Sequence, residues 1–397
     1  MEQLALDQQQ ETLYPRFSDA EFERRYQRVR ALLSERGLDG LVAFGWSALG
    51  RAAQADVQYL SGFLGMRDNY VLFPLRGEPV LFVQSWNHVP HASVVASVAD
   101  VRWGGSDSGA TVGQEIARRG LRAIGLVGPM PYQHHASLCA AAGPDVAVSD
   151  LTSAFRRLRV TKSEAELDWL RRGAAYTDAA LTALEREARP GLREYELAEI
   201  IEHAYLRAGG QTQFYYLAST PMTNPDRCVP AQTLSSRRLQ VGDVITTEIS
   251  IAYGGYAGQG LRTFVLDAEP TALFRDLHAV AEQVYRDVAR ALRPGATHEA
   301  VLDAAELIAQ RGYSIRDGLV HGYGVGLLPP SIRTRQTDQD QGQTPWIFEA
   351  NQTLVIQPNV VTADERAGVQ VGDLCVVTPD GAQSLHRFPL QLVQCRG

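Results

Sequence analysis

The sequence predicts an α/β (α+β) protein of two domains, because two different patterns follow each other along the chain. Short apolar runs alternate with helical patterns in the first part. A long helical pattern then begins after residue 160 and leads to a strongly alternating stretch at 241–267. A chain of 397 residues, 45% of them hydrophobic, is long enough to bury the core of each domain.

The first part begins with a helix that its capping residues define. Ser18 and Glu21 have the spacing of a capping box, apolar residues follow at helical spacing, and Gly37 is a stop signal, which predicts a helix over 19–36. Apolar runs of strand character then alternate with helical pieces, as expected for an α/β domain. The predicted strands are 41–44, 71–75, 80–83 and 123–127, and the predicted helices are 111–119 and 132–142.

The second part begins with another capping arrangement, Ser163 with Glu166, which predicts a long helix over 164–186. Pro190 and Gly191 end that helix. Further helical patterns cover 194–208, 271–292 and 298–310. This change of pattern predicts an amino-terminal domain at residues 1–160 and a carboxy-terminal domain at 161–397.

The stretch at 241–267 predicts a β-hairpin around which the second domain is arranged. Polar and apolar residues alternate along the outgoing strand, and Gly254-Gly255 supplies the turn before the return strand. Glu248 lies on one face of the outgoing strand, and Gln259 follows eleven residues later, across the turn.

Composition excludes several classes of partner. The 45 acidic and 38 basic residues give a net charge of −7 and a pI near 5.8, so binding to nucleic acid or to an anionic membrane surface is not expected. The opening residues lack the regions of a secretion signal, and no apolar run has the length of a membrane span, which predicts a cytoplasmic protein. The four cysteines have no CxxC spacing, so we expect reduced thiols.

Four motifs carry a resemblance to a known family. They are the Glu248 to Gln259 hairpin with Arg262-Thr263-Phe264 after it, Gly322-Tyr323-Gly324-Val325-Gly326-Leu327, the run from Glu349 to Pro358, and the run from Gly368 to Asp373. Together they resemble the M24 family, which has the pita-bread fold and includes methionine aminopeptidase, Xaa-Pro aminopeptidase, prolidase and creatinase. The segments 33–42 and 56–63 are similar to the creatinase-type amino-terminal domain. The resemblance therefore implies the creatinase and Xaa-Pro branch, in which such a domain precedes the pita-bread domain.

The resemblance also implies that the metal ligands of the family are lost. Its five ligand positions fall here on Glu248, Gln259, Tyr323 or Val325, Gln357 and Gly372. A glutamine amide is neutral and cannot replace a carboxylate that bridges two divalent cations. Asp373 cannot take the place of Gly372, because a shift of one residue turns a strand side chain to the opposite face. We therefore expect no bound metal and no other cofactor.

Creatinase is the metal-independent precedent in the family, but this chain is not expected to act on creatine. The catalytic His of creatinase falls at Ala231, and the two glutamates that bind the guanidinium fall at Leu261 and Gln357. His321 is the strongest candidate for the base, because an imidazole exchanges protons near neutral pH without a metal. We expect it to lie in a glycine-rich turn that tolerates its truncation.

Two further residues complete the catalytic set that the resemblance implies. Glu248 either orients His321 or acts as the base itself. Tyr323 is a candidate donor to a developing oxyanion.

The candidate substrate-binding residues are arginines and glutamines. Arg67 resembles the arginine that creatinase uses for the carboxylate of its substrate, and Arg333 or Arg335 offers a second guanidinium. A guanidinium suits a carboxylate because it donates two parallel hydrogen bonds. The set is completed by Arg262, Gln259 and Gln357.

Three functions are consistent with these residues. The first is metal-independent hydrolysis of a C–N bond in a small, carboxylate-bearing substrate, rather than metallopeptidase activity. The second is a non-hydrolytic reaction at the same site, by a lyase or decarboxylase, and the third is a catalytically inactive, peptidase-like protein that binds peptides or proteins. The resemblance further implies a homodimer in which the amino-terminal domain of one copy closes over the site of the other.

Overall fold

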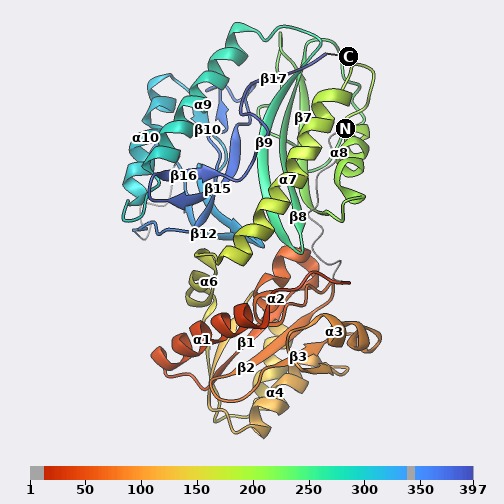
Figure 1. Cartoon of the computed structure of the whole chain (residues 1–397), viewed down its shortest axis with the longest axis vertical. Helices are drawn as coiled ribbons and strands as arrows, with labels where there is room; N and C mark the ends of the chain where they lie inside the picture. Colours follow the sequence, from red (N-terminus) through yellow and green to blue (C-terminus); the bar gives the residue numbers. More distant parts are fainter. Residues whose placement is uncertain (1–12, 338–344, 397) are drawn as a thin grey trace. The chain divides into compact units, whose positions relative to one another are not determined.

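The structure of the chain, a computed structural model, describes residues 13–337 and 345–396 (Figure 1). The chain divides after Leu158 into two compact units, an amino-terminal unit and a carboxy-terminal unit. A helix suited to crossing a membrane is not found in the described part of the chain.

The amino-terminal unit is built on one six-stranded sheet. Its strands are β1 (Gly40–Gly45), β2 (Asn69–Pro74), β3 (Val80–Val83), β4 (Asp100–Trp103), β5 (Ala123–Val127) and β6 (Ala147–Asp150). Their order is β4-β3-β2-β1-β5-β6, and β1 is antiparallel to β2 but parallel to β5. The α-helices of this unit are α1 (Asp19–Glu35), α2 (Ala55–Ser61), α3 (Val89–Val95), α4 (Ser108–Arg118) and α5 (Tyr132–Ala142), and α6 (Thr152–Val160) runs across the division between the units.

Local signals predicted most of these elements. The hydroxyl of Ser18 caps α1 by accepting a hydrogen bond of 3.3 Å from the backbone N–H of Glu21, and the helix begins at the next residue, Asp19. The strands predicted at 41–44, 71–75, 80–83 and 123–127 are confirmed as β1, β2, β3 and β5, and the helices at 111–119 and 132–142 are confirmed as α4 and α5.

Among its described residues, the carboxy-terminal unit contains four α-helices, a large sheet and a separate two-stranded sheet. The helices are α7 (Glu164–Glu187), α8 (Glu196–Leu206), α9 (Ala272–Ala291) and α10 (His298–Gln310). The strands are β7 (Gln211–Pro221), β8 (Asp243–Tyr253), β9 (Tyr256–Leu266), β10 (Ser314–Ile315), β11 (Val320–Gly324), β12 (Gly326–Ile332), β13 (Thr353–Ile356), β14 (Val360–Val361), β15 (Gly372–Thr378), β16 (Gly381–Ser384) and β17 (Val393–Cys395). The predicted helices and the hairpin of β8 and β9 are confirmed, including the capping box of Ser163 and Glu166 at the start of α7.

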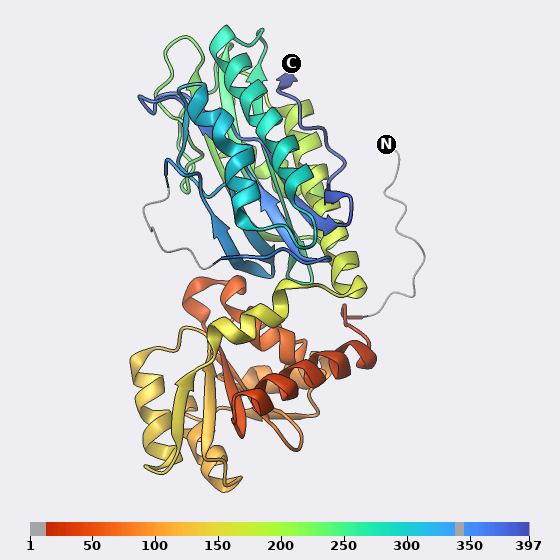
Figure 2. The same ribbon diagram turned by 90° about the vertical axis from the view of Figure 1, so that its left-hand side faces the viewer.

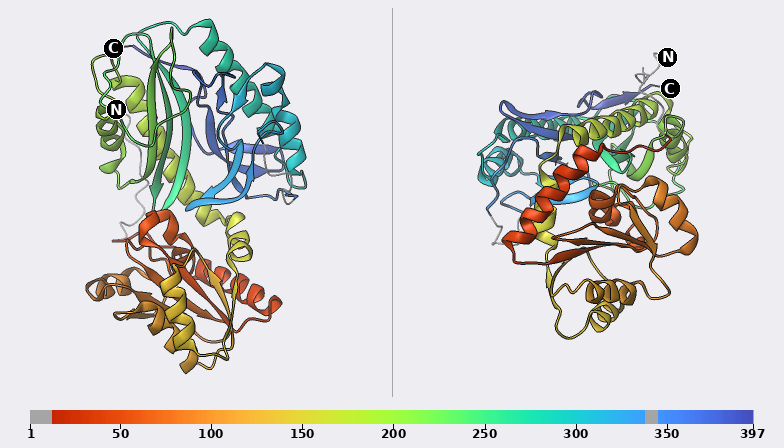
Figure 3. Two further views of the ribbon diagram at one scale, coloured as in Figure 1. Left: turned by 180° about the vertical axis from the view of Figure 1, so that it is seen from behind. Right: turned by 60° about the horizontal axis from the view of Figure 1, so that its bottom comes forward.

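The sheet of this unit has the order β12-β11-β13-β15-β9-β8-β7, so strands far apart in the sequence become neighbours. Helix α7 packs along β8 and β9 (Figure 1), and α9 and α10 pack side by side (Figure 2). Viewed from behind, β7, β8 and β9 lie in front of α7 (Figure 3). One face of these three strands therefore carries α7, and the other face is turned away from it.

Glycines in β9 identify the face that α7 covers. A Cβ added to Gly258 would lie 2.3 Å from the backbone of Ala174 in α7, and one added to Gly260 would lie 3.2 Å from the side chain of Thr177. Because side chains alternate along a strand, Gln259 lies on the opposite face. The pairing of Ser250 with Gln259 and of Glu248 with Leu261 places Glu248 there as well.

Candidate active site

Five neighbouring strands bring the candidate residues of the carboxy-terminal unit together. Glu248 lies on β8, Gln259 on β9 and Tyr323 on β11, while Gln357 directly follows β13 and Gly372 begins β15. These strands are joined in the order β11-β13-β15-β9-β8. We call Glu248, Gln259, His321, Tyr323 and Gln357 the Glu248 cluster.

A chain of hydrogen bonds joins the carboxyl of Glu248 to the two glutamines. Nε2 of Gln259 donates to Oε1 of Glu248 at 2.8 Å and to Oε1 of Gln357 at 3.1 Å. Nε2 of Gln357 donates in turn to the carbonyl of Gly318 at 3.0 Å. Oε1 of Gln259 is buried and has no hydrogen-bond partner in the described part of the chain. This series of hydrogen bonds thus links two amides and one carboxyl, and it leaves the acceptor Oε1 of Gln259 without a donor in the described part of the chain.

The carboxyl of Glu248 holds its proton unusually strongly. Burial and, to a smaller extent, the negative charge of Asp317 raise the pKa of Glu248 to about 8. At neutral pH the group is therefore a neutral carboxylic acid, which can donate a proton.

Tyr323 is the residue of the glycine motif whose side chain enters the Glu248 cluster. Its hydroxyl is hydrogen-bonded to Oγ of Ser250 at 2.7 Å, and Ser250 lies two residues after Glu248 on β8. Burial and the nearby charge of Glu248 raise the pKa of Tyr323, so the hydroxyl remains a proton donor. Val325 lies instead in the turn between β11 and β12, where its carbonyl accepts a hydrogen bond of 3.2 Å from Arg159.

His321 lies within a strand, not in the glycine-rich turn that the sequence suggested. It is part of β11, where it pairs with Val355 of β13 and Ser331 of β12, and its residue is only 9% exposed. Nδ1 is 3.2 Å from the carbonyl of Gly322, and the ring packs edge-on against that of Tyr323 with centroids 5.7 Å apart. Burial lowers the pKa of His321, although hydrogen bonds to Gly322 and Gln357 and the charge of Asp317 act in the opposite direction. The imidazole is therefore neutral at neutral pH and able to accept a proton.

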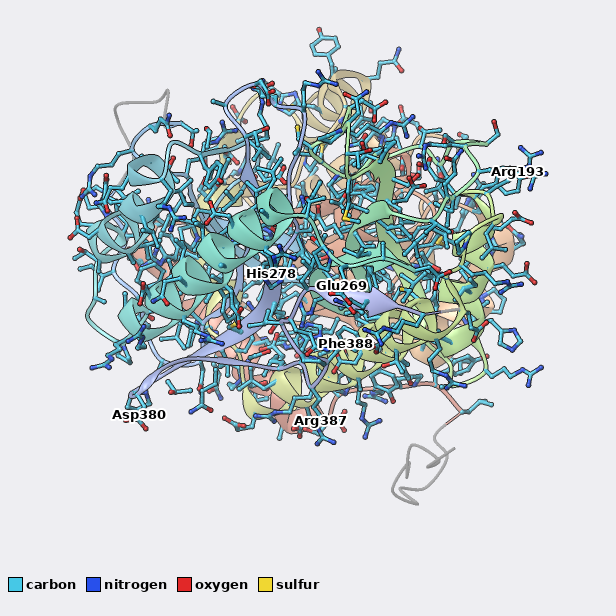
Figure 4. All side chains as sticks on the ribbon, turned by 90° about the horizontal axis from the view of Figure 1, so that it is seen from above. Arg193, Glu269, His278, Asp380, Arg387 and Phe388 are labelled. Atoms are coloured by element: carbon cyan, nitrogen blue, oxygen red, sulfur yellow. The ribbon has the colours of Figure 1, made fainter. Side chains whose placement is uncertain are left out.

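Arg262 is not available to a substrate, which corrects its proposed role. Its side chain is fully buried, and its guanidinium donates to Asp373 at 2.9 Å and to the backbone carbonyls of Leu261, Gly372, Phe388 and Pro389. It pairs with Thr247 and so points to the face opposite Glu248. Arg262 thus fixes the segment that follows β16, on which Arg387 and Phe388 are labelled in Figure 4.

Arg335 also lies outside the Glu248 cluster, contrary to the prediction. It is exposed, and it forms ion pairs with three carboxylates of α10, those of Glu299, Asp303 and Glu306, at 2.7 to 3.0 Å. Arg333 is exposed directly after the end of β12. Its role in substrate binding remains a prediction.

Arg67 belongs to the amino-terminal unit, where it lines a hollow of about 470 Å³. Its side chain is exposed. The hollow is also lined by His88, His91 and Asn69 together with apolar residues, and none of its lining residues is acidic. This arrangement is compatible with the binding of an anionic group, and such binding is the role predicted for Arg67.

Three residues near Glu248 were not identified from the sequence. Asp317 precedes β11 and is held by a hydrogen bond of 3.0 Å from Nδ2 of Asn359. Tyr216 lies directly opposite Glu248 on β7, and its ring stacks on that of Phe214 with centroids 4.7 Å apart. Tyr216 is placed by the pairing of β7 with β8, and Asp317 is placed by a loop, so neither left a local signal in the sequence.

Two family models together match most of the chain. Residues 168–379 match the model described as metallopeptidase family M24, and residues 25–161 match the creatinase/prolidase N-terminal domain.

Individual relatives agree with these matches. The chain is 28% identical to probable dipeptidase PepE of Mycobacterium tuberculosis over 282 residues, which are 68% of this chain and 70% of that protein. The crystal structure of dipeptidase PepE from Mycobacterium ulcerans has a TM-score of 0.76 and 25% identity and covers 96% of this chain and 100% of its own. Xaa-Pro dipeptidase from Bacillus anthracis is similar in fold, with a TM-score of 0.78 at 18% identity, covering 94% and 99% of the two chains.

The name of the matching family implies divalent metal ions, and the residues of this site do not fit them. Gln259 turns an amide N–H toward Glu248, and such a donor cannot ligate a cation. A side chain at Gly372 would place its Cβ 2.5 Å from the carbonyl oxygen of Ile356. In the described part of the chain, no three His, Cys, Asp or Glu side chains gather as a metal-binding group. The donor set is that of a hydrogen-bonded polar site.

Proposed function

This chain belongs to metallopeptidase family M24, and we propose that within this family it is a metal-independent hydrolase of a C–N bond in a small, carboxylate-bearing substrate. The observation that carries the proposal is the hydrogen-bonded chain of Glu248, Gln259 and Gln357, at positions where the resemblance expects metal ligands. Relatives named as dipeptidases favour an amide as the bond that is cleaved.

The proposed chemistry uses two groups whose pKa values are displaced in opposite directions. Burial raises the pKa of Glu248 to about 8 and lowers the pKa of His321, so at neutral pH the carboxyl carries a proton and the imidazole does not. Such a pair supplies a general acid and a general base at the same pH. His321 would take a proton from the attacking water, and Glu248 would protonate the leaving nitrogen.

The protons of this reaction balance without a cofactor. The water oxygen first forms the new C–O bond, and the C–N bond of this intermediate then breaks as the nitrogen leaves with the proton of Glu248. The proton that His321 took from water then restores Glu248, and the acidic proton of the new carboxylic acid converts the amine to an ammonium ion. The hydroxyl of Tyr323 would donate a hydrogen bond to the oxyanion of the intermediate.

Recognition of the substrate carboxylate is proposed to come from Arg67 of a second copy of the chain. In the carboxy-terminal unit, Arg262 and Arg335 are already bonded to protein carboxylates. Arg67 is exposed beside a hollow without acidic residues. The proposal therefore includes a homodimer.

The test is a search for cleavage in the absence of divalent metal. The protein is dialysed against EDTA, checked by elemental analysis, and incubated in ¹⁸O-water with dipeptides and other small amides that bear a carboxylate. We expect one of these classes to be cleaved with one ¹⁸O atom in the new carboxylate. Activity that appears only after Mn²⁺, Co²⁺ or Zn²⁺ is added would refute metal independence, and a product without ¹⁸O would indicate a lyase instead.

Matched variants connect that activity to the site. Glu248→Gln and His321→Gln should each lower turnover, because each removes one proton-transfer group while keeping a side chain of similar shape. Glu202→Gln is the control, since Glu202 lies on α8 and accepts a hydrogen bond from Tyr215 instead of facing the cluster. Full activity in Glu248→Gln or His321→Gln would remove that residue from the mechanism.

A further inference from the structure

Two aromatic rings lie beside the acid of the proposed reaction. Phe214 and Tyr216 stack with their planes 21° apart, and both are half-buried. Tyr216 pairs with Glu248 across β7 and β8, and Phe214 pairs with Ser250. Residues directly opposite on antiparallel strands share a face, so both rings lie on the face of the Glu248 cluster. This is the face turned away from α7 (Figure 3).

Asp317 brings a negative charge to the same place, and Glu248 has no positively charged partner among the described residues. Asp317 is half-buried and acts electrostatically on both Glu248 and His321. No positively charged side chain of the described residues offsets the burial of Glu248. A positive ligand would supply the counter-charge that the protein omits.

A buried hydrogen-bond acceptor, Oε1 of Gln259, has no donor in the described part of the chain, so a ligand that fits this place should carry N–H groups. Gln259 is 1% exposed, and its amide orientation is fixed because Nε2 donates to both Glu248 and Gln357. Its Oε1 is therefore left as a buried acceptor without a donor in the described part of the chain. Buried acceptors are normally satisfied, so this atom points to a ligand or water that donates a hydrogen bond.

We propose that Phe214, Tyr216, Glu248, Gln259 and Asp317 form a subsite for an organic ammonium ion with a flat or apolar substituent, which is the amine product of the reaction. This inference rests on the proposed function, because hydrolysis turns the leaving nitrogen into such an ion beside Glu248, the group that protonates that nitrogen first. Aromatic faces attract cations, and carboxylates pair with them. The N–H groups of the ion would reach the acceptors of Glu248 and Gln259.

The subsite can be tested without knowing the substrate, with benzylammonium as the probe. Isothermal titration calorimetry at constant ionic strength should show that benzylammonium binds at least about ten-fold more tightly than benzyl alcohol or benzoate, since only the first carries a positive charge. Benzyltrimethylammonium, which has the charge but no N–H, should bind more weakly than benzylammonium. Equal binding of the charged and the neutral probe would overturn the proposal.

Matched variants test whether benzylammonium binds at this face of the sheet or is attracted only by the overall negative charge of the protein. Asp317→Asn and Tyr216→Leu should each weaken benzylammonium binding several-fold. Their controls are Glu202→Gln, which removes the same charge, and Tyr215→Leu, which removes the neighbouring ring on the other face of β7. If a control weakens binding as much as its matched variant, the assignment to this face is wrong. Asp317→Asn keeps the test open should Tyr216→Leu fail to fold, because Asp317 lies in a loop.

Proton release gives a readout that a purely structural role would not affect. Glu248 is protonated in the free protein and should ionise when it pairs with an ammonium ion. Titrations in two buffers of different ionisation enthalpy at neutral pH should therefore show up to about one proton released per benzylammonium bound, and none for Glu248→Gln. Absence of proton release in the wild type would contradict the pairing with Glu248. Benzylammonium binding in a protein that cleaves no amide would leave the subsite standing and refute the hydrolase alone.

Discussion

Replacing Glu248 by Gln should stabilise the protein at alkaline pH and have little effect at acid pH. In the folded protein the pKa of Glu248 is raised from its ordinary 4.5 to about 8. At 1.36 kcal/mol for each pK unit, ionising this carboxyl within the fold costs roughly 5 kcal/mol, and relaxation of the partly exposed site reduces this to about 2–5 kcal/mol. Glutamine has the same shape, accepts the hydrogen bond from Gln259 and never ionises, so the variant avoids that cost.

The sign of the effect follows from proton binding. Below pH 4.5 the carboxyl is protonated in both folded and unfolded chains, and it contributes no pH dependence. Between 4.5 and about 8 the unfolded chain releases this proton while the folded chain keeps it, so the free energy of unfolding falls as the pH rises. Above about 8 both states are ionised, and the full penalty remains.

Urea unfolding of the wild type and Glu248→Gln at a series of pH values measures this difference. Fluorescence and far-UV circular dichroism must give coincident transitions before a free energy is assigned. The stability advantage of the variant should grow by about 2–5 kcal/mol between about pH 5 and about pH 9, whereas Glu202→Gln should show no such growth. A difference between wild type and Glu248→Gln that does not change with pH would refute the elevated pKa and the acid role built on it.

Four further predictions concern other residues of the fold and site. His321→Gln should lower turnover by about 10²–10⁴-fold, and the wild-type rate should rise with pH through the lowered pKa of His321 and fall through about 8, measured as a pH–rate profile. Arg262→Met should reduce the free energy of unfolding by about 3–5 kcal/mol, because its carboxylate partner stays buried and unpaired, as measured by urea unfolding. Light scattering should give the mass of a dimer, and Arg67→Ala should weaken substrate binding by about 2–5 kcal/mol, measured as a rise in KM at unchanged dimer mass. Gln357→Glu should lower stability at neutral pH without creating a metal site, checked by unfolding with and without Mn²⁺, because it adds a second carboxyl to the buried chain of hydrogen bonds.

The sequence predicted those parts of the fold that local chemistry determines. Ser18 and Ser163 cap α1 and α7 through hydrogen bonds to residues three positions later, and such signals are complete within a few residues. The hairpin of β8 and β9 was found because alternation and a Gly-Gly turn are also local. Strand β7 was missed, although it holds Tyr216 opposite Glu248, because its place in the sheet depends on pairing with β8.

The error at Arg262 has a different origin. The residue type suggested anion binding, but Arg262 stands three positions after Gln259, and an odd spacing on a strand puts a side chain on the opposite face. The period of the strand thus contained the correct answer. At Arg335 no such local signal exists, since its three carboxylate partners come from α10, about 30 residues earlier.

The residues at the five positions where the resemblance expected metal ligands are consistent with one another once they are placed in the fold. A single carboxyl, Glu248, remains where the family would combine several with cations, and burial without a counter-charge keeps it protonated. Additional carboxylates beside it would repel one another, whereas the amides of Gln259 and Gln357 can donate and accept within one chain of hydrogen bonds. At the fifth position Gly372 is required by contact, since β15 passes too close to Ile356 for any side chain. These residues therefore fit one another as parts of one coupled change, and the proposed function takes this site to hold a proton where the family would hold cations.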